Sequence, residues 1–132
     1  MDKIKAGVKG YLELLLFLLP VYTLVFFLQR WGVLEGLAAK AEPFMGFVGL
    51  PGEAALVIIL GNFVNLYAAL GAVAGLGLSS REVTILALML LLSHNQILEG
   101  AVILRVRRGF LALAPLRFVV SVLAAHVLHP YL

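Results

Sequence analysis

The sequence predicts an all-α membrane protein, and three observations lead to that fold class. Hydrophobic residues make up 63% of the 132 positions, charged residues only 13%, and the mean hydropathy is +1.08. A soluble domain is nearer half apolar and a quarter charged. A transmembrane helix needs roughly 20 residues, so this length accommodates about four spanning or half-spanning elements. We expect a single membrane domain over residues 1–132.

The first predicted element is a transmembrane helix from about Ile4 to Gln29. Its start is amphipathic, because Lys5, Lys9 and Glu13 follow one another at intervals of four residues, and its remainder is almost wholly apolar. Pro20 lies near mid-span, where a membrane helix tolerates proline if a neighbour satisfies the freed carbonyl. The apolar run is too long for a signal-peptide core and no small-residue cleavage site follows it, so we expect this helix to remain as an anchor.

The second predicted element, from Val33 to Phe47, carries too many charges to span the bilayer alone. It is either a helix lying in the interface or the descending arm of a re-entrant hairpin. Gly49-Leu50-Pro51-Gly52-Glu53 follows, and glycine and proline at this density interrupt helices. The apolar stretch from Ala54 to Gly77 is long for half of a hairpin, so we expect it to bend at Gly61-Asn62.

The third predicted element is a helix that begins near Ser80 and has polar residues at its centre. Ser79 or Ser80 can cap it, and Glu82 suits its first turn. Ser93-His94-Asn95-Gln96 and then Glu99 interrupt the apolar sequence. Polar groups at mid-membrane are costly unless they face protein, water or a ligand. Because four consecutive side chains point in all directions around a continuous helix, we expect the helix to be broken within this run.

The last predicted element runs from Phe110 to Leu128, and the basic residues then predict the topology. If the chain enters and leaves the membrane on one side between Val33 and Gly77, seven basic residues lie on one side and three on the other; a full span from Ala54 to Gly77 gives four against six. The positive-inside rule prefers the first arrangement, with the richer side cytoplasmic. The richer set is Lys3, Lys5, Lys9, Arg105, Arg107, Arg108 and Arg117, and the other is Arg30, Lys40 and Arg81.

Several functional classes are not expected from this composition. The chain has no cysteine, which excludes disulfides, thiolate metal sites and cysteine nucleophiles. His126 and His129 are three residues apart near the C-terminus and far from His94, so we expect no metal site and no cofactor. Ser93 and His94 are adjacent in sequence, which does not place a nucleophile opposite its base, so we expect no enzyme. The net charge of +3 arises at the ends of apolar spans, which indicates lipid contact and no nucleic-acid partner.

Polar residues in the apolar part of the chain form the candidate site for a polar solute. Each has a structural alternative: the acidic residue at the proline–glycine turn suits a helix N-terminus, the two asparagines can cap a break, and the central run can join helices by hydrogen bonds. The eight candidate residues are Glu53, Asn62, Asn65, Ser93, His94, Asn95, Gln96 and Glu99.

Three short stretches carry a family resemblance. Gly49-Leu50-Pro51-Gly52-Glu53-Ala54-Ala55, Leu78-Ser79-Ser80-Arg81-Glu82 and Ser93-His94-Asn95-Gln96-Ile97-Leu98-Glu99 resemble the nucleoside-recognition "Gate" domain. That domain occurs in spore maturation proteins A and B and in ferrous-iron transporters of the FeoB type, and is similar to one repeat of the concentrative nucleoside transporters. The resemblance covers about residues 35–108. It implies a re-entrant hairpin whose tip, near Pro51-Gly52-Glu53, meets a discontinuous helix, with Glu53 in the position of a carboxylate that contacts a nucleoside.

Two functions follow as expectations. The first is a membrane transport or solute-recognition protein for a polar, nucleoside-like small molecule, which acts as half of an oligomeric transporter in a bacterial or archaeal cytoplasmic membrane. Its second half is either an identical chain or a paralogous membrane subunit, because transporter sites of this type lie where two repeats meet. The alternative is a non-transporting structural or partner subunit, whose polar centre only holds helices together.

Overall fold

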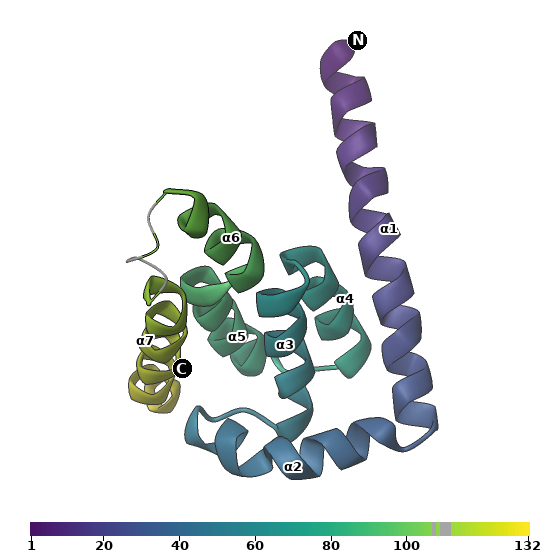
Figure 1. Ribbon diagram of the computed structural model, residues 1–132. Helices are drawn as coiled ribbons and strands as arrows, with labels where there is room; N and C mark the ends of the chain where they lie inside the picture. The colour runs from purple at the N-terminus through teal and green to yellow at the C-terminus, as the bar shows by residue number, and fades with distance from the viewer. Residues whose placement is uncertain (107, 109–111) are drawn as a thin grey trace.

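The computed structural model describes residues 1–106, 108 and 112–132, and these residues are helical apart from short connections (Figure 1). Among them, α1 and the C-terminal stretch Leu113–Tyr131 are long and apolar enough to cross a membrane, and the bent pair Val33–Phe47 and Gly52–Phe63 is a third candidate. The elements are α1 (Asp2–Arg30), α2 (Val33–Phe47), η1 (Gly52–Ala54), α3 (Ala55–Phe63), α4 (Leu66–Leu76), α5 (Ser80–Ser93), α6 (Gln96–Val106), α7 (Leu113–Leu128) and η3 (His129–Tyr131).

The second half of α1 packs on α4, whereas its first half extends beyond the other helices (Figure 1). Two glycines of α4 make this approach possible. A Cβ atom at Gly71 would lie 2.8 Å from the Leu18 carbonyl oxygen, and one at Gly75 would lie 2.8 Å from Val25 Cγ1. Small residues at a helix crossing allow close backbone approach, which is how membrane helices gain packing energy without a hydrophobic driving force.

The chain turns by 93° between α2 and the η1–α3 segment. The expected hairpin tip near Pro51-Gly52-Glu53 is thus a bend of about a right angle, which is compatible with either a broken span or a re-entrant loop. Gly49, at φ +74°, ends α2, and Gly52 lies directly against the Ala38 carbonyl, where a Cβ would collide. Glycine and proline break a helix without specifying the angle that follows, so the sequence located the turn and not its size.

The reversal occurs between α3 and α4, which run back along each other (Figure 1). α3 ends at Phe63, and Asn65 caps α4 by accepting a hydrogen bond from the Ala68 N–H at 2.8 Å. The bend was expected at Gly61-Asn62, three residues too early. Gly61 instead allows α3 to approach both α5 and α4, because a Cβ there would collide with the Leu90 side chain and would lie 3.3 Å from the Ala69 Cβ.

The helix after Ser79 has the predicted cap and the predicted break. Ser79 and Glu82 form a capping box, in which each side chain accepts a hydrogen bond from the other residue's backbone N–H. α5 ends at Ser93 and α6 begins at Gln96, so the interruption lies within the polar run. Phe110, the expected start of the last helix, and Arg107 lie outside the described residues, and α7 begins at Leu113.

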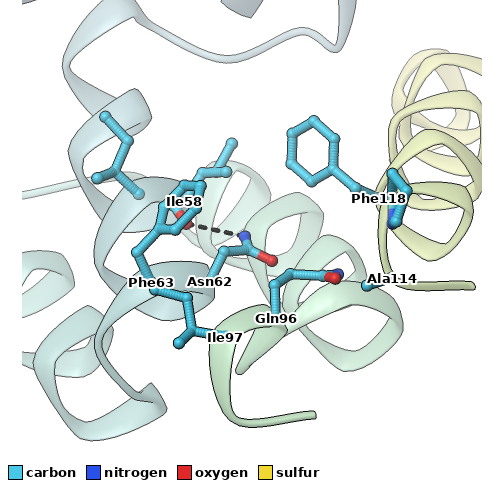
Figure 2. A pocket seen from close by; sticks show the side chains of 9 residues that line it. Ile58, Asn62, Phe63, Gln96, Ile97, Ala114 and Phe118 are labelled. Carbon is cyan, nitrogen blue, oxygen red and sulfur yellow. Dashed lines mark hydrogen bonds between the residues drawn. The ribbon is translucent and has the colours of Figure 1, made fainter. Parts of the chain in front are cut away.

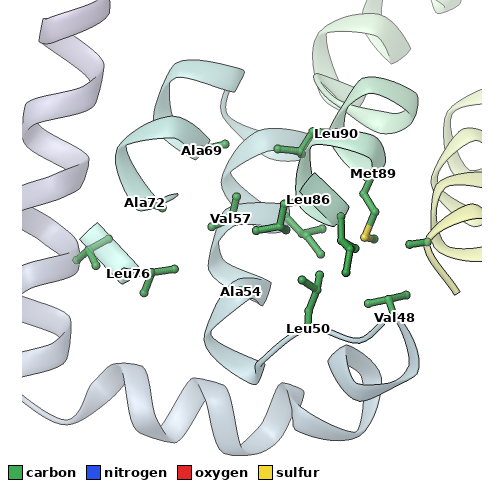
Figure 3. Close-up of a cluster of buried hydrophobic side chains, with 14 of the residues drawn as sticks. Val48, Leu50, Ala54, Val57, Ala69, Ala72, Leu76, Leu86, Met89 and Leu90 are labelled. Atoms are coloured by element: carbon green, nitrogen blue, oxygen red, sulfur yellow. The ribbon is translucent and has the colours of Figure 1, made fainter. Parts of the chain in front are cut away.

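The hydrophobic core lies where α3, α4 and α5 meet the 48–50 connection (Figure 3). Val57, Leu86 and Met89 are almost completely buried there. At the lower end in Figure 1, the C-terminal residues are tied to the start of α5 and the end of α2. The Arg81 guanidinium donates to the His129 carbonyl at 2.7 Å, and His126 Nδ1 lies 2.6 Å from the Phe47 carbonyl.

Candidate functional site

The break between α5 and α6 contacts the α3–α4 hairpin directly. The Asn95 N–H donates to the Gly61 carbonyl oxygen at 2.9 Å, which joins the α5–α6 break to the last turn of α3 by a backbone hydrogen bond. Asn95 has φ +55°, a left-handed conformation that asparagine adopts more readily than most residues. The Asn95 carbonyl then accepts from the Glu99 N–H at 2.9 Å and so begins α6. The polar run thus lets the chain stop and restart a helix beside the hairpin.

The side chains of the polar run bond mostly to nearby backbone. Ser93 Oγ donates to the Met89 carbonyl at 2.8 Å, and His94 Nδ1 lies 2.7 Å from the Leu90 carbonyl. The last carbonyls of a helix lack partners within it, and here the amide nitrogen of Gln96 donates to the Ser93 carbonyl at 2.7 Å. These bonds satisfy the backbone where α5 ends.

Asn62, near the end of α3, is the exception, because one of its polar atoms lacks a hydrogen-bond partner among the described residues. Asn62 is 2% exposed, and its Nδ2 donates to the Ile58 carbonyl at 2.8 Å. Its Oδ1 is buried with no hydrogen-bond partner among the described residues. A buried acceptor left unpaired costs about 1–3 kcal/mol, so this oxygen is a place where a donor from outside the chain would be stabilised.

A cavity of about 520 Å³ lies beside Asn62, between α3, the start of α6 and the start of α7 (Figure 2). Two amide side chains, Asn62 and Gln96, contribute its polar lining. In Figure 2 the Asn62 oxygen points toward the Gln96 side chain. The remaining lining residues are apolar: Ile58, Ile59, Phe63, Ile97, Ala114, Pro115 and Phe118. Ligand sites have this character, with an apolar lining and a few placed polar groups, and volumes of roughly 300–1,000 Å³.

The other predicted site residues are distributed around this cavity or away from it. Ser93 is buried in the core, and Asn95 contacts the hairpin through its backbone. His94 lines a separate, apolar cavity of about 280 Å³ between α4 and α5. Asn65 serves as a helix cap, which is the structural alternative considered for it.

Glu53 does not lie at the cavity. It belongs to η1, at the opposite end of α3 from Asn62, and nine residues of helix correspond to about 14 Å at 1.5 Å per residue. Its neighbour Gly52 donates its N–H to Glu42 Oε2 at 3.3 Å. The sequence grouped Glu53 with the central polar residues because of the expected hairpin tip, and the right-angle turn separates them.

Glu99 forms an ion pair with Arg117 of α7, a partner that the sequence analysis missed. Arg117 Nε also donates to the Leu92 carbonyl at 2.9 Å. One arginine therefore joins the end of α5, the first turn of α6 and α7. From the sequence, Arg117 was counted only among the topology residues, although an arginine within an apolar helix, four residues after the helix begins at Leu113, is itself a signal for an internal partner.

Comparison with known proteins identifies the family. The family model described as "Gate: Nucleoside recognition" matches residues 11–108, which is most of the chain. The chain belongs to the Gate family. The match extends further toward the N-terminus than the motifs did and takes in most of α1.

A curated relative supports the membrane assignment of this Gate protein. This chain is 46% identical over 87 residues to the "Uncharacterized membrane protein YvoD" of Bacillus subtilis (strain 168). The match covers 66% of this chain and 28% of that protein, so the chain spans little more than a quarter of the relative's length. No solved structure matches. Together with its apolar helices, these similarities identify the chain as an integral membrane protein.

Proposed function

We propose that this Gate protein recognises and transports a polar, nucleoside-like small molecule across a bacterial or archaeal cytoplasmic membrane. The observation that carries the proposal is the contact between the α5–α6 break and the last turn of α3 beside a cavity. The Asn95 N–H bonds to Gly61 at 2.9 Å, and the unpaired Asn62 oxygen and Gln96 adjoin the cavity next to that contact. Transporter sites are commonly built from broken helices of this kind, with irregular backbone lining a cavity.

The lengths of the central helices support a membrane placement in which the α3–α4 hairpin is re-entrant and α5 and α6 form one discontinuous span. α3 has 9 residues and α4 has 11, so each crosses only about half of a bilayer that needs roughly 20. α2, with its charged residues, lies across the end of this arrangement in Figure 1 and suits the interface. The interruptions would then lie at mid-membrane.

We propose that another chain supplies the second half of the transporter. One chain contributes one re-entrant hairpin and one broken helix, whereas transporters of this architecture build the site between two repeats. An identical chain or a paralogous membrane subunit would supply the other. Mass determination in nanodiscs tests this: a dimer or larger assembly is expected, and a monomer that binds solute would contradict the half-transporter proposal.

A second candidate function is a structural subunit without transport activity, and one observation favours it. Ser93, His94 and Gln96 already bond to backbone carbonyls within the chain, as interhelical or capping groups do. We propose no catalytic role in either case.

Flux of radiolabelled uridine into proteoliposomes separates the two functions. The variant is Gln96→Leu, which removes a cavity amide, and its matched control is Gln29→Leu at the end of α1, whose amide makes a 3.5 Å contact with the Gly75 carbonyl. We expect uridine flux with the unmodified protein and little change for the control. For Gln96→Leu we expect a reduction of about tenfold, because the variant loses about one hydrogen bond to the solute. No flux with the unmodified protein would favour the structural subunit. Flux that Gln96→Leu leaves unchanged would mean that the solute does not use the cavity beside Gln96.

A further inference from the structure

The chemistry of the cavity indicates what kind of solute it accepts. Its two amides are oriented by their backbone bonds. The Asn62 amide faces the Ile58 carbonyl at 2.8 Å, and the Gln96 amide faces the Ser93 carbonyl at 2.7 Å. A carbonyl oxygen only accepts hydrogen bonds, so in both cases the atom facing it must be the NH₂ group. The oxygen atoms of both amides are therefore the groups left to bond elsewhere.

The unpaired oxygen of Asn62 determines that this site needs a hydrogen-bond donor from the solute. It is buried and has no donor among residues 1–106, 108 and 112–132. An N–H or O–H group of a solute would satisfy it, and a solute with only acceptors would leave it unpaired. Because the oxygen is itself covered, we expect the neighbouring Gln96 side chain to move aside when a donor reaches it. Gln96 is only partly buried, which leaves room for that movement.

Charge near the cavity argues against an anionic solute. Arg117 lies on the helix that contributes Ala114, Pro115 and Phe118 to the wall, but its guanidinium is paired with Glu99 and donates to the Leu92 carbonyl. An anion placed against amide oxygens and apolar side chains would lose its hydration without gaining a partner, which is strongly unfavourable. The apolar walls instead suit an uncharged ring or hydrocarbon body.

We infer that the Asn62–Gln96 cavity selects uncharged small molecules that combine an apolar or aromatic body with a hydrogen-bond donor, and that it rejects phosphorylated and other anionic forms. This rests on the proposed function, because it assumes that the cavity is the solute site. It goes further by separating nucleosides and similar amides from nucleotides, and by assigning the selection to the Asn62 oxygen.

Two matched pairs of probes test this in protein reconstituted into nanodiscs. Uridine is compared with 3-methyluridine, and benzamide with N,N-dimethylbenzamide; in each pair methylation removes the N–H donors of one group. Uridine 5′-monophosphate and benzoate supply the anions. Equilibrium binding is measured for each probe. N,N-dimethylbenzamide has no donor, so we expect benzamide to bind at least about tenfold more tightly than its methylated partner. 3-Methyluridine keeps its ribose hydroxyl donors, so we expect a smaller loss of affinity relative to uridine, and we expect the anions to bind more weakly still.

The decisive variant is Asn62→Leu, which replaces the amide by an apolar side chain of similar size. It should abolish the preference within each pair. Because it removes an unpaired buried acceptor together with a bonded donor, its thermal stability should stay close to that of the unmodified protein. Asn65→Ser is the matched control, since serine also caps helices and the preference should remain. If Asn62→Leu does not fold, Gln96→Leu, on the less buried amide, provides the same measurement and should weaken the preference.

The outcomes separate this inference from the proposed function. Donor preference in the benzamide pair with no binding of either nucleoside supports the selection rule and overturns the nucleoside-like solute. Equal binding within the benzamide pair, tighter binding of the anions, or a preference that Asn62→Leu leaves intact overturns the selection rule while solute recognition stands. Binding of no probe in either pair, with only lipid or detergent in the cavity, overturns both.

Discussion

Gly52 is the residue at which a single added methyl group has the clearest consequence. Its Cβ position is occupied by the Ala38 backbone carbonyl of α2, which cannot move without shifting that helix. We expect Gly52→Ala to destabilise the protein by about 1–3 kcal/mol through overpacking. Gly36→Ala is the control, because a Cβ at this exposed helical glycine meets nothing within 4 Å. That change should be neutral or stabilising by up to about 1 kcal/mol. Thermal unfolding in detergent measures both, and equal stability of the two variants would contradict the close packing of α2 on η1.

Arg117 is a second residue with a sharp expected effect, because it serves three elements at once. Arg117→Met leaves the Glu99 carboxylate without its partner and the Leu92 carbonyl without its donor. Removing one member of a buried ion pair costs about 3–5 kcal/mol, and we expect a loss toward the lower end because both side chains are about a third exposed, at 34% and 35%. The double variant Arg117→Met with Glu99→Gln should recover part of that stability. If the double variant is as unstable as the sum of the single ones, the pairing is wrong.

At the scale of single elements, α5 provides the most direct test of the local sequence signals. Its capping box predicts that Ser79→Ala lowers the free energy of unfolding by about 1 kcal/mol. Ser80→Ala, one residue later and within the helix, is the control and should have an effect of only a few tenths of a kcal/mol, because alanine suits a helix interior. Chemical denaturation in mixed micelles gives both values. A larger loss for Ser80→Ala than for Ser79→Ala would move the start of α5.

Local signals predicted elements better than they predicted how elements are arranged. The bounds of α2 were predicted from Val33 to Phe47, as observed, because Gly32 directly precedes the helix and Gly49 closely follows it. The break between α5 and α6 was predicted from the polar run. The hairpin reversal was not, because the chain has glycines at several candidate positions and the choice among them depends on which faces of α3 and α4 fit together. Val64 and Asn65 gave only a weak signal, an asparagine before an apolar run.

The candidate site was predictable in its parts and not in its grouping. Asn62 and Gln96 were selected because polar side chains in an apolar sequence need partners, and both adjoin one cavity. Glu53 was grouped with them only through an expected hairpin tip. Arg117 was assigned to topology because its partner, Glu99, lies on a different helix, and no spacing rule connects residues across helices.

For the whole molecule, the arrangement of helices divides the basic residues into two sets. α1 runs from the end that carries Lys3, Lys5 and Lys9 to the end that carries Arg30, and Lys40 and Arg81 lie at this second end (Figure 1). Arg105 and Arg108 follow the second half of the broken helix, on the side of the α1 N-terminus. Among these described residues, five basic side chains belong to the first end and three to the second. Arg117 is left out of this count because it forms an ion pair with Glu99. The positive-inside rule then predicts that the N-terminal end of α1 faces the cytoplasm.

The absence of cysteine makes this topology directly measurable, because an introduced cysteine is the only thiol in the chain. Ala6→Cys, at the exposed start of α1, and Lys40→Cys, on α2, leave the richer basic set unchanged. A membrane-impermeant maleimide added to intact cells should label Lys40→Cys and should label Ala6→Cys only after the cells are permeabilised. The cysteine-free protein controls for background labelling. Labelling of both variants from the outside would mean that α1 does not separate these two ends across the membrane, and labelling of Ala6→Cys alone would invert the orientation derived from the charges.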